Sequence, residues 1–447
     1  MRSRKRLAAS PFEPGVHVKR AVITVGLGFG DEGKGATVDF LTRDLGADLV
    51  IRYCGGSQAG HNVELPDGRR HTFSQFGAGT LAPNPPRTYL GSAVVIDPPA
   101  MLREASHLAE LGIANPLQLI TVHPRCLVTT PWLRLLNRVR ELSRGEARHG
   151  SCGHGIGEAR SYWLQRGEDA VFAADLLDSR RLHHKLELQR QRILLEAQPL
   201  IELCSAEALH KIGADVWELN ADDAADQLSE PVKGQITVSE EVPSHQMAIL
   251  EGAQGVLLDE YRGFHPHTTW STVTPRHAWE LVSQMGSEAV TLLGITRAYS
   301  TRHGAGPFPT FSPELTARLA DPGNPWNAWQ GSLRCGWLDM VMLRYSVAAC
   351  GSLDGLVVNH LDQLEGTNTR MCDAYNNGVL APSSVPNLGW QTRLSEQVQT
   401  AEPVLELATS ESILRTLGSL APVVVTGYGP THSARRSSGL SFRMKRD

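Results

Sequence analysis

Long apolar runs, CxxC pairs and an excess of charge of either sign are all missing from this 447-residue sequence. No run of about 20 apolar residues occurs, so we expect no membrane-spanning helix. The 43 Lys and Arg nearly balance the 47 Asp and Glu, giving a net charge of −4, which argues against a nucleic-acid partner. The seven cysteines are scattered and odd in number, so we expect neither a disulfide framework nor a zinc knuckle, and a cytoplasmic location fits best.

The composition is that of a large globular protein. Hydrophobic residues make up 41% of the chain and charged residues 20%, which is enough to build a sizeable core. The first six residues are rich in Arg and Lys, but only Leu7, Ala8 and Ala9 follow closely, too few for a secretion signal. We therefore expect a disordered basic tail over 1–20 and a single large domain over 21–440.

Short runs of aliphatic and β-branched residues repeatedly end at glycine-rich or polar segments. A helix is predicted from Gly33 to about Arg43. Strands alternating with helical stretches favour an α/β fold with a mostly parallel central sheet, whose ligands bind at the carboxyl ends of the strands. The polar stretch at about 131–244 is predicted to be a helical insertion covering the sheet. The predicted strands are 21–26, 49–53, 93–97, 247–250, 289–293, 355–358 and 422–425.

The segment GLGFGDEGKG, starting at Gly26, follows the first predicted strand. Gly28 to Lys34 satisfy the GxxxxGK pattern of a phosphate loop, in which backbone N–H groups and a helix N-terminus face an anion. Gly35 stands where such loops usually carry the Ser or Thr that binds Mg²⁺. A carboxylate beside a phosphate is unfavourable, so we expect Asp31 to bind a metal or to accept a proton.

Segment 55–62 is a second glycine-rich stretch after a predicted strand, and it contains a single histidine. His61 is able to donate to a developing phosphate charge. A lone histidine is just as often structural, so this segment does not decide the function by itself.

In combination, the motifs resemble those of the adenylosuccinate synthetase family. They occur in order from about Ala21 to Pro430, nearly the whole chain. The resemblance implies a P-loop-like central sheet with long active-site loops over one crevice. The resembling segments are 30–35, 55–61, 95–98, 153–157, 251–255, 297–302, 306–310, 335–339, 359–362 and 427–430.

The resemblance implies a GTP-dependent carbon–nitrogen ligase of purine nucleotide biosynthesis. In that family, GTP phosphorylates the 6-oxygen of IMP, and the amino group of aspartate then displaces the phosphate. By resemblance, Asp31 takes the N1 proton of the purine and binds Mg²⁺, with the Gly60 carbonyl as a second ligand of the kind that this hard cation prefers. His61 stabilises the leaving phosphate, and Gln254 hydrogen-bonds the purine oxygen.

The GTP site is also implied by the resemblance. Asp362 accepts the N1–H and N2–H of guanine, which adenine does not offer, and so favours GTP over ATP. His360 stands where the family usually has lysine. The other residues assigned to GTP are Gly30, Glu32, Gly33, Lys34, Gly35, Asn359, Gly427 and Gly429.

Three residues align with the family's contacts to the IMP phosphate. Thr269 matches a threonine, and Arg166 matches an arginine that crosses a homodimer interface. Cys152 stands in place of a second threonine, and a thiol is a weaker hydrogen-bond donor than a hydroxyl. The resemblance therefore implies a homodimer in which Arg166 reaches the neighbouring site.

The pattern fails in the loop that holds aspartate. The family has Thr-Thr-Gly-Arg-x-Arg-Arg, whereas segment 328–334 reads AWQGSLR. Gly331 and Leu333 therefore stand at two arginine positions, and only Arg334 remains. Bidentate recognition of carboxylates by guanidinium groups is hard to replace with such residues.

The motifs that activate the 6-oxygen with GTP are kept, whereas the loop that holds the amine is altered. This leaves three hypotheses open. The first is an adenylosuccinate synthetase that holds aspartate with Arg334, Arg302 or Arg276. The second is a related enzyme that adds a different amine, with Trp329 and Leu333 offering apolar surface, or uses a modified nucleotide in specialised metabolism. The third is a non-catalytic GTP-binding relative, although the presence of both Asp31 and His61 counts against it.

Overall fold

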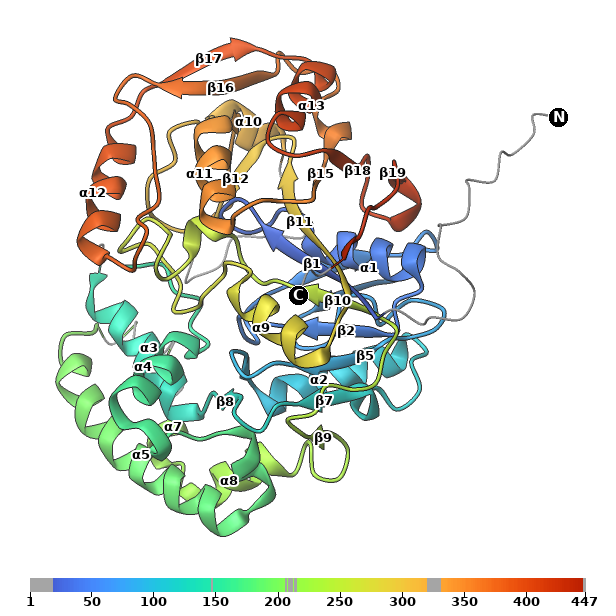
Figure 1. The fold of residues 1–447 in the computed structure, drawn as a ribbon. Helices are drawn as coiled ribbons and strands as arrows, with labels where there is room; N and C mark the ends of the chain where they lie inside the picture. Colours follow the sequence, from blue (N-terminus) through green and yellow to red (C-terminus); the bar gives the residue numbers. More distant parts are fainter. Residues whose placement is uncertain are drawn as a thin grey trace.

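A largely parallel sheet forms the centre of the molecule (Figure 1). The computed structural model describes residues 19–145, 148–205, 207, 212, 215–319 and 331–444. β20 (Arg443–Met444) and β19 pair antiparallel with their neighbours, and the other pairings in this sheet are parallel. The strand order is β19 (Arg435–Ser437), β18 (Val423–Gly427), β15 (Gly355–Asn359), β11 (Ala289–Arg297), β1 (Arg20–Gly26), β10 (Met247–Glu251), β2 (Leu49–Arg52), β5 (Arg87–Leu90), β7 (Ile120–Val122) and β9 (Thr237–Val238).

Helices cover both faces of the sheet, so its central strands are apolar on both sides. In β1, Val22 packs into one core, whereas Ala21, Ile23 and Val25 pack into another. Such strands appear in a sequence as continuous aliphatic runs, which is why most of them could be predicted. One face carries α1 (Lys34–Leu45) and α2 (Pro98–Glu110), and the other carries α9 (Arg276–Met285), α11 (Met340–Cys350) and α13 (Ser410–Gly418).

The described residues of the stretch predicted as a helical insertion are mostly helical. In Figure 1 its helices lie below the sheet, beside the edge formed by β7 and β9. Helix α5 packs against both α3 and α8. Apolar side chains of these helices, such as Trp132, Leu182 and Leu228, join the same core as Val22 and Val50 of the sheet. The helices are α3 (Pro131–Ser143), α4 (Ile156–Arg166), α5 (Ser179–Ile201), α7 (Asp215–Glu218) and α8 (Ala221–Ser229).

Short accessory sheets hold the connecting loops. The predicted strand at 93–97 forms only β6 (Val95–Ile96), which pairs with β8 (Leu127–Val128) outside the central sheet. The remaining elements are the hairpin β3 (His61–Glu64) and β4 (Arg70–Phe73), the pair β12 (Ser300–Arg302) and β13 (Arg334–Gly336), the sheet of β14 (Leu338–Asp339), β16 (Arg370–Tyr375) and β17 (Pro403–Leu407), and the helices α10 (Pro313–Arg318) and α12 (Leu388–Gln399).

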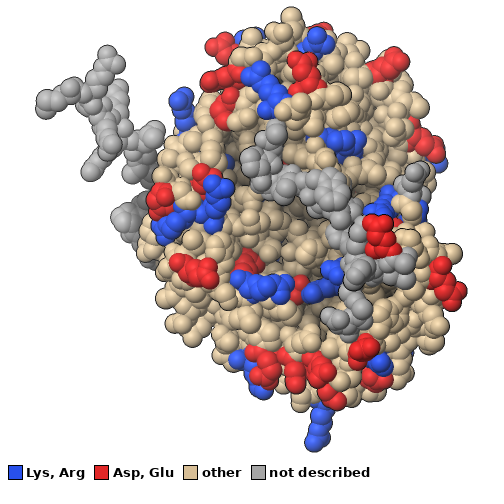
Figure 2. All heavy atoms as spheres, turned by 180° about the vertical axis from the view of Figure 1, so that it is seen from behind, with Lys and Arg blue, Asp and Glu red and all other residues tan. Residues whose placement is uncertain are grey.

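The surface mixes charges of both signs. Figure 2 shows Lys, Arg, Asp and Glu scattered over one face, which is hollowed near its centre. None of the helices among the described residues is long and apolar enough to cross a membrane. None of the seven cysteines, all of which lie in the described part of the chain, forms a disulfide bond. Of the segment 1–20 expected to be disordered, 1–18 lie outside the described residues, and Arg20 is the first residue of β1.

Candidate functional site

The predicted motifs follow strands that lie side by side in the central sheet. β1, β2, β10, β11, β15 and β18 run parallel and adjacent or nearly so. Their carboxyl ends lead into the segments at 26–35, 55–61, 251–255, 297–302, 359–362 and 427–430. Because parallel strands end at one edge, these motifs gather there, as the sequence predicted.

Glu32 turns back into the phosphate loop between β1 and α1. Its Oε1 accepts hydrogen bonds from the Gly28 N–H at 2.9 Å and the Gly30 N–H at 2.8 Å, and its Oε2 pairs with Lys34 Nζ at 2.5 Å. Both charged side chains are almost completely buried. Glu32 therefore engages part of the loop from inside, and Lys34, which has three N–H donors, is also held by this carboxylate.

Gly35 has a structural reason to be glycine. A Cβ at this position would lie 2.7 Å from the carbonyl carbon of His61 and 2.8 Å from the carbonyl oxygen of Asn62. Such distances are too short for a side chain, so the usual Ser or Thr cannot fit here. The close approach brings the start of β3, and with it His61, against the first turn of α1.

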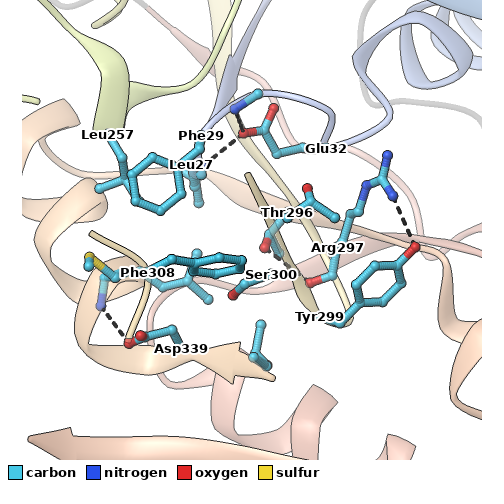
Figure 3. A pocket seen from close by; sticks show the side chains of 16 residues that line it. Leu27, Phe29, Glu32, Leu257, Thr296, Arg297, Tyr299, Ser300, Phe308 and Asp339 are labelled. Carbon is cyan, nitrogen blue, oxygen red and sulfur yellow. Dashed lines mark hydrogen bonds between the residues drawn. The ribbon is translucent and has the colours of Figure 1, made fainter. Parts of the chain in front are cut away.

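Figure 3 shows a small cavity against the phosphate loop. Phe29, Leu257 and Phe308 line it with apolar surface, and Arg297 donates from Nη1 to the Tyr299 hydroxyl at 2.9 Å. Its volume is about 30 Å³, close to that of one water molecule. The cavity is too small for a purine nucleotide, so we regard it as part of the support of the loop.

Three predicted site residues share an unusual backbone conformation. The φ angle is 58° at Asp31, 60° at Gln254 and 61° at His360, and among the described non-glycine residues only Asn115 joins them with a positive φ of 44°. This left-handed region is unfavourable for side-chain-bearing residues and is most often maintained at functional sites. The backbone therefore marks the same loops as the motifs do.

The Asp31 carboxylate is accessible and has few contacts of its own. Its side chain is 26% exposed, and His303 Nε2 lies 3.6 Å from Oδ2. Arg297 Nε donates to the Asp31 carbonyl oxygen, which fixes the backbone. Gly60 is exposed. The described residues contain no cluster of three or more His, Cys, Asp or Glu able to hold a metal. A carboxylate and a carbonyl fit Mg²⁺, which binds few protein groups and completes its shell with phosphates and water.

His61 is buried and linked to a second carboxylate. Its Nδ1 bonds to Glu251 Oε1, and its Nε2 has no hydrogen-bond partner among the described residues. Burial, together with the positive charge of Arg52, lowers the pKa of His61 to about 4, although Glu251 offsets part of this shift. The ring is therefore neutral at pH 7 in the empty site.

Gln254 and Thr269 lie together although 15 residues separate them. Gln254 Nε2 donates to Thr269 Oγ1 at 3.3 Å, and Gln254 Oε1 is buried with no hydrogen-bond partner among the described residues. The sequence assigned one residue to the purine oxygen and the other to the nucleotide phosphate. Their contact places both assignments in one site.

Cys152 and Arg166 flank helix α4. Cys152 is partly buried, and burial raises the pKa of its thiol to about 11, so the thiol stays protonated. At the N-terminal end of the helix, Gly157 packs against Trp270, the neighbour of Thr269. Arg166, the last residue of α4, is exposed and makes no ion pair with the described residues. Helix α4 therefore connects the neighbourhood of Thr269 to the surface.

Asn359 ties the end of β15 to the phosphate loop. Its Nδ2 donates to the Glu32 carbonyl oxygen at 2.8 Å and to Thr37 Oγ1 at 3.1 Å. A Cβ on Gly427 would lie only 2.7 Å from Asn359 Oδ1. Asn359 was predicted to bind GTP, and here its amide nitrogen is engaged within the protein.

Only one of the two carboxylate oxygens of Asp362 is hydrogen-bonded within the described chain. Its Oδ2 accepts from Gln363 Nε2 at 2.6 Å, whereas Oδ1 is buried without a hydrogen-bond partner among the described residues. Nearby, the His360 ring lies 6.0 Å from that of Tyr299, and burial lowers the pKa of His360. Arg435 Nη1 donates to the Thr431 carbonyl at 2.7 Å and lies 3.5 Å from that of Gly429, which braces the loop after β18.

Two arginines face each other across β12 and β13. Arg302 and Arg334 are register partners, and their guanidinium groups donate to carbonyl oxygens of segment 304–307 at 2.6 to 3.3 Å. Arg302 is 1% exposed and stacks over Phe29 at 4.1 Å. Burial and the charge of Arg334 lower the pKa of Arg302 to about 9. No carboxylate of the described residues forms an ion pair with either arginine, and uncompensated buried cations favour an anionic ligand.

His267 lies beside this arginine pair. A Cβ on Gly306 would lie 2.1 Å from Arg302 Nη2 and 2.8 Å from His267 Cγ, so both side chains close on the same glycine. A groove of about 300 Å³, lined by His267, Pro266, Pro307 and residues of α12, opens at this point. Neither arginine lines this groove, but Pro307, whose carbonyl accepts from Arg302 Nη1 at 2.7 Å, does.

The structure corrects one expectation for the rewritten loop and removes one candidate. Leu333 is buried in the core under the sheet, so it offers no apolar surface to an amine. Trp329 lies outside the described residues. Arg276 is largely exposed and paired with Glu280, which leaves Arg302 and Arg334 as the candidates for holding carboxylates.

Sequence reasoning missed Glu251, His303 and Arg435. Glu251 and His303 stand within or next to quoted motifs, but their contacts with His61 and Asp31 link segments 190 and 272 residues apart, respectively. Arg435 follows the last motif and has no sequence signal. Glu251 and Arg435 differ from ordinary surface charges only in being buried, which the structure shows and the sequence does not.

Comparisons with known proteins identify the family. The sequence model of the family described as adenylosuccinate synthetase matches residues 23–410. The adenylosuccinate synthetase of Marinomonas sp. (strain MWYL1) is 33% identical over 379 residues, covering 83% of this chain and 84% of its own length. That of Azotobacter vinelandii (strain DJ / ATCC BAA-1303) is 34% identical over 435 residues, covering 92% and 96%, respectively.

Solved structures confirm the predicted fold. The fully ligated adenylosuccinate synthetase of Plasmodium falciparum superposes with a TM-score of 0.71 at 19% identity, over 95% of this chain and 100% of that chain. The succinoaminodeoxyadenylate synthetase of cyanophage S-2L, bound to dGMP and dATP, gives a TM-score of 0.58 at 17% identity, over 94% and 96%. The matches favour neither a different amine nor a loss of catalysis. The chain belongs to the adenylosuccinate synthetase family and is a GTP-dependent ligase that forms a carbon–nitrogen bond.

Proposed function

We propose that this site joins aspartate to IMP in two steps, with the described residues in the following roles. The observation that carries the proposal is the gathering of Asp31, His61 and Gln254 at one edge of the sheet, two of them in left-handed backbone conformations. Asp31 takes the N1 proton of IMP, which makes the 6-oxygen nucleophilic toward the γ-phosphoryl group of GTP. Gln254 hydrogen-bonds that oxygen.

His61 stabilises the phosphoryl group at the 6-oxygen. Its Nε2 has no hydrogen-bond partner in the described chain, so this nitrogen is left for a ligand. A phosphoryl group against Nε2 supplies negative charge, which favours the protonated ring that donates to it. The amine then expels a phosphate, a far better leaving group than an oxide.

The Asp31 carboxylate and the Gly60 carbonyl would hold Mg²⁺ together with the phosphates of GTP. When bound, the ion neutralises charge on the transferring group. Gly30, Glu32, Gly33, Lys34 and Gly35 belong to the loop that binds the GTP phosphates.

Asp362 selects guanine. Its unpartnered Oδ1 suits the N–H donors of that base. Adenine would leave this carboxylate without a donor, which makes the binding of ATP less favourable than that of GTP. His360, Asn359, Gly427 and Gly429 form the surrounding loops.

Arg302 and Arg334 hold the carboxylates of aspartate. The absence of an ion-pair partner for either in the described chain, and their position beside a groove, support this role. Charge-assisted bonds from guanidinium to carboxylate are strong and planar, as dicarboxylate recognition requires.

The IMP phosphate is bound by Thr269 and by the weaker donor Cys152. Arg166, exposed at the end of α4, completes the neighbouring site in a homodimer. The free cysteines fit a reducing cytoplasm.

One assay tests the proposed reaction. The protein is incubated with GTP, Mg²⁺ and IMP, with and without aspartate, while GDP release and the mass of the nucleotide product are followed. We expect adenylosuccinate only with aspartate present, with one GDP per product. GDP release without adenylosuccinate would point to a different amine, and absence of any turnover would indicate a silent relative.

A further inference from the structure

Glu251 is a buried carboxylate to which the motifs gave no role. It is the last residue of β10, is 0% exposed, and has Thr24 of β1 and Arg52 of β2 as its neighbours across the sheet. A buried carboxylate is unfavourable unless it is paired and hydrogen-bonded, so its contacts reveal what it does.

Each oxygen of Glu251 has a separate partner. Oε1 bonds to His61 Nδ1, and Oε2 accepts from the Ala78 N–H at 3.0 Å. Arg52 Nη1 lies 4.0 Å from Oε1. Although burial opposes the charge, Arg52 and the bond from His61 hold the pKa of Glu251 below its usual value. An ionised carboxylate only accepts hydrogen bonds, so Nδ1 carries the proton in this pair.

The pair leaves one ring nitrogen of His61 for a ligand. The backbone of His61 is fixed opposite Phe73 in the β3–β4 hairpin, and Nδ1 is fixed by Glu251. We propose that Glu251 is a positioning residue for His61, which holds the ring in one orientation with the proton on Nδ1, so that Nε2 faces the phosphoryl group. This inference rests on the role proposed above for His61.

Glu251 also binds segment 74–78 through Ala78, and a purely structural role must be distinguished. Glu104 provides a matched control, because it is a buried carboxylate that accepts the N–H groups of Ser74, Gln75 and Phe76 in the same segment. It lies near His71 rather than His61.

The test compares Glu251→Gln with Glu104→Gln in the full chain. We expect Glu251→Gln to lower kcat about 10–100-fold, by analogy with carboxylates that orient metal-bound histidines, with KM for IMP and aspartate within about threefold. Glu104→Gln should lower the melting temperature and leave kcat within about twofold. An unchanged kcat in Glu251→Gln, or an equal loss in Glu104→Gln, overturns the inference.

A double-mutant cycle and a spectroscopic measurement complete the test. In a His61→Ala background, Glu251→Gln should cause no further loss of kcat, whereas a full additional loss contradicts a role through His61. ¹⁵N NMR of labelled histidine should show the His61 proton on Nδ1, with the signal identified by its absence in His61→Ala. A proton on Nε2 in the empty wild-type protein overturns the inference. The NMR result holds even if the wild type makes no adenylosuccinate, so failure of the proposed function is recognised separately.

Discussion

The phosphate-activating half of the site and the half around Arg302 and Arg334 differ in the buried groups that they offer a ligand. In the first half, the buried atoms without hydrogen-bond partners among the described residues include the acceptors Gln254 Oε1 and Asp362 Oδ1, together with His61 Nε2. In the second, two guanidinium groups lack a carboxylate partner in the described chain. The first half therefore offers acceptors for the N–H groups of purine bases beside its phosphate loop, and the second offers cations for carboxylates, although only the first keeps the expected motif.

The comparison shows that arginines able to bind carboxylates can be present in a site whose usual arginine motif is lost. Two arginine positions of the aspartate loop have become Gly331 and Leu333, yet positive charge is still concentrated on β12 and β13. The following changes test whether the two halves are as separate as their contacts indicate.

Asp31→Asn has the largest expected effect. Loss of a general base typically lowers turnover about 10²–10⁴-fold, because an amide cannot take the purine proton. Asn also tolerates the left-handed backbone at this position, so folding should persist. Steady-state kcat and GTP titration by calorimetry provide the readouts. Near-full activity of this variant would show that Asp31 is not the general base and serves only to shape the loop or to bind the metal.

Arg334→Gln should act on the other half alone. Losing a charge-assisted bond worth about 1.5–3 kcal/mol corresponds to a rise of roughly 10–150-fold in the KM for aspartate, with the KM for GTP unchanged. Arg276→Gln is the matched control, since that arginine is exposed and paired with Glu280. If the control variant lost aspartate affinity and Arg334→Gln did not, the assignment would be reversed.

Asp362→Asn should weaken the choice of nucleotide. An amide accepts with one atom and lacks the charge, so the ratio of kcat/KM for GTP over ATP should fall about tenfold. Both substrates are measured at saturating IMP and aspartate. A ratio near one in the wild type would already remove Asp362 from this role.

Cys152→Thr should have the smallest effect, and in the favourable direction. A hydroxyl donates better than a thiol, and one neutral hydrogen bond contributes about 0.5–1.5 kcal/mol, so the KM for IMP should fall roughly 2–10-fold. A rise in this KM would show that the thiol does not face the phosphate.

Local sequence predicted the structure wherever one segment carried the whole signal. Aliphatic runs predicted six strands that are covered on both faces, namely β1, β2, β10, β11, β15 and β18. The phosphate loop could be recognised by its glycines. β5 was missed because its four residues, RTYL, are not an aliphatic run, and β7 was missed because it has only three residues.

Features that depend on contacts between distant segments could not be predicted. Leu333 is buried because it directly precedes β13, whose position is set by the fold. Arg302 pairs with Arg334 because of the register between two strands in which these residues are 32 positions apart. The contact of Glu251 with His61 depends on the β3 hairpin packing against α1. In each case the residue type was visible in the sequence, but its neighbour was not.

The left-handed conformations of Asp31, Gln254 and His360 imply that function and stability compete in this chain. Each such residue destabilises the fold by roughly 1–2 kcal/mol, a noticeable part of a typical net stability of about 5–15 kcal/mol. Glycine at any of these three positions relieves that strain while removing the side chain. A search for heat-resistant variants of this protein would therefore be drawn toward the very substitutions that silence it, and ligand-dependent activity has to be part of the screen.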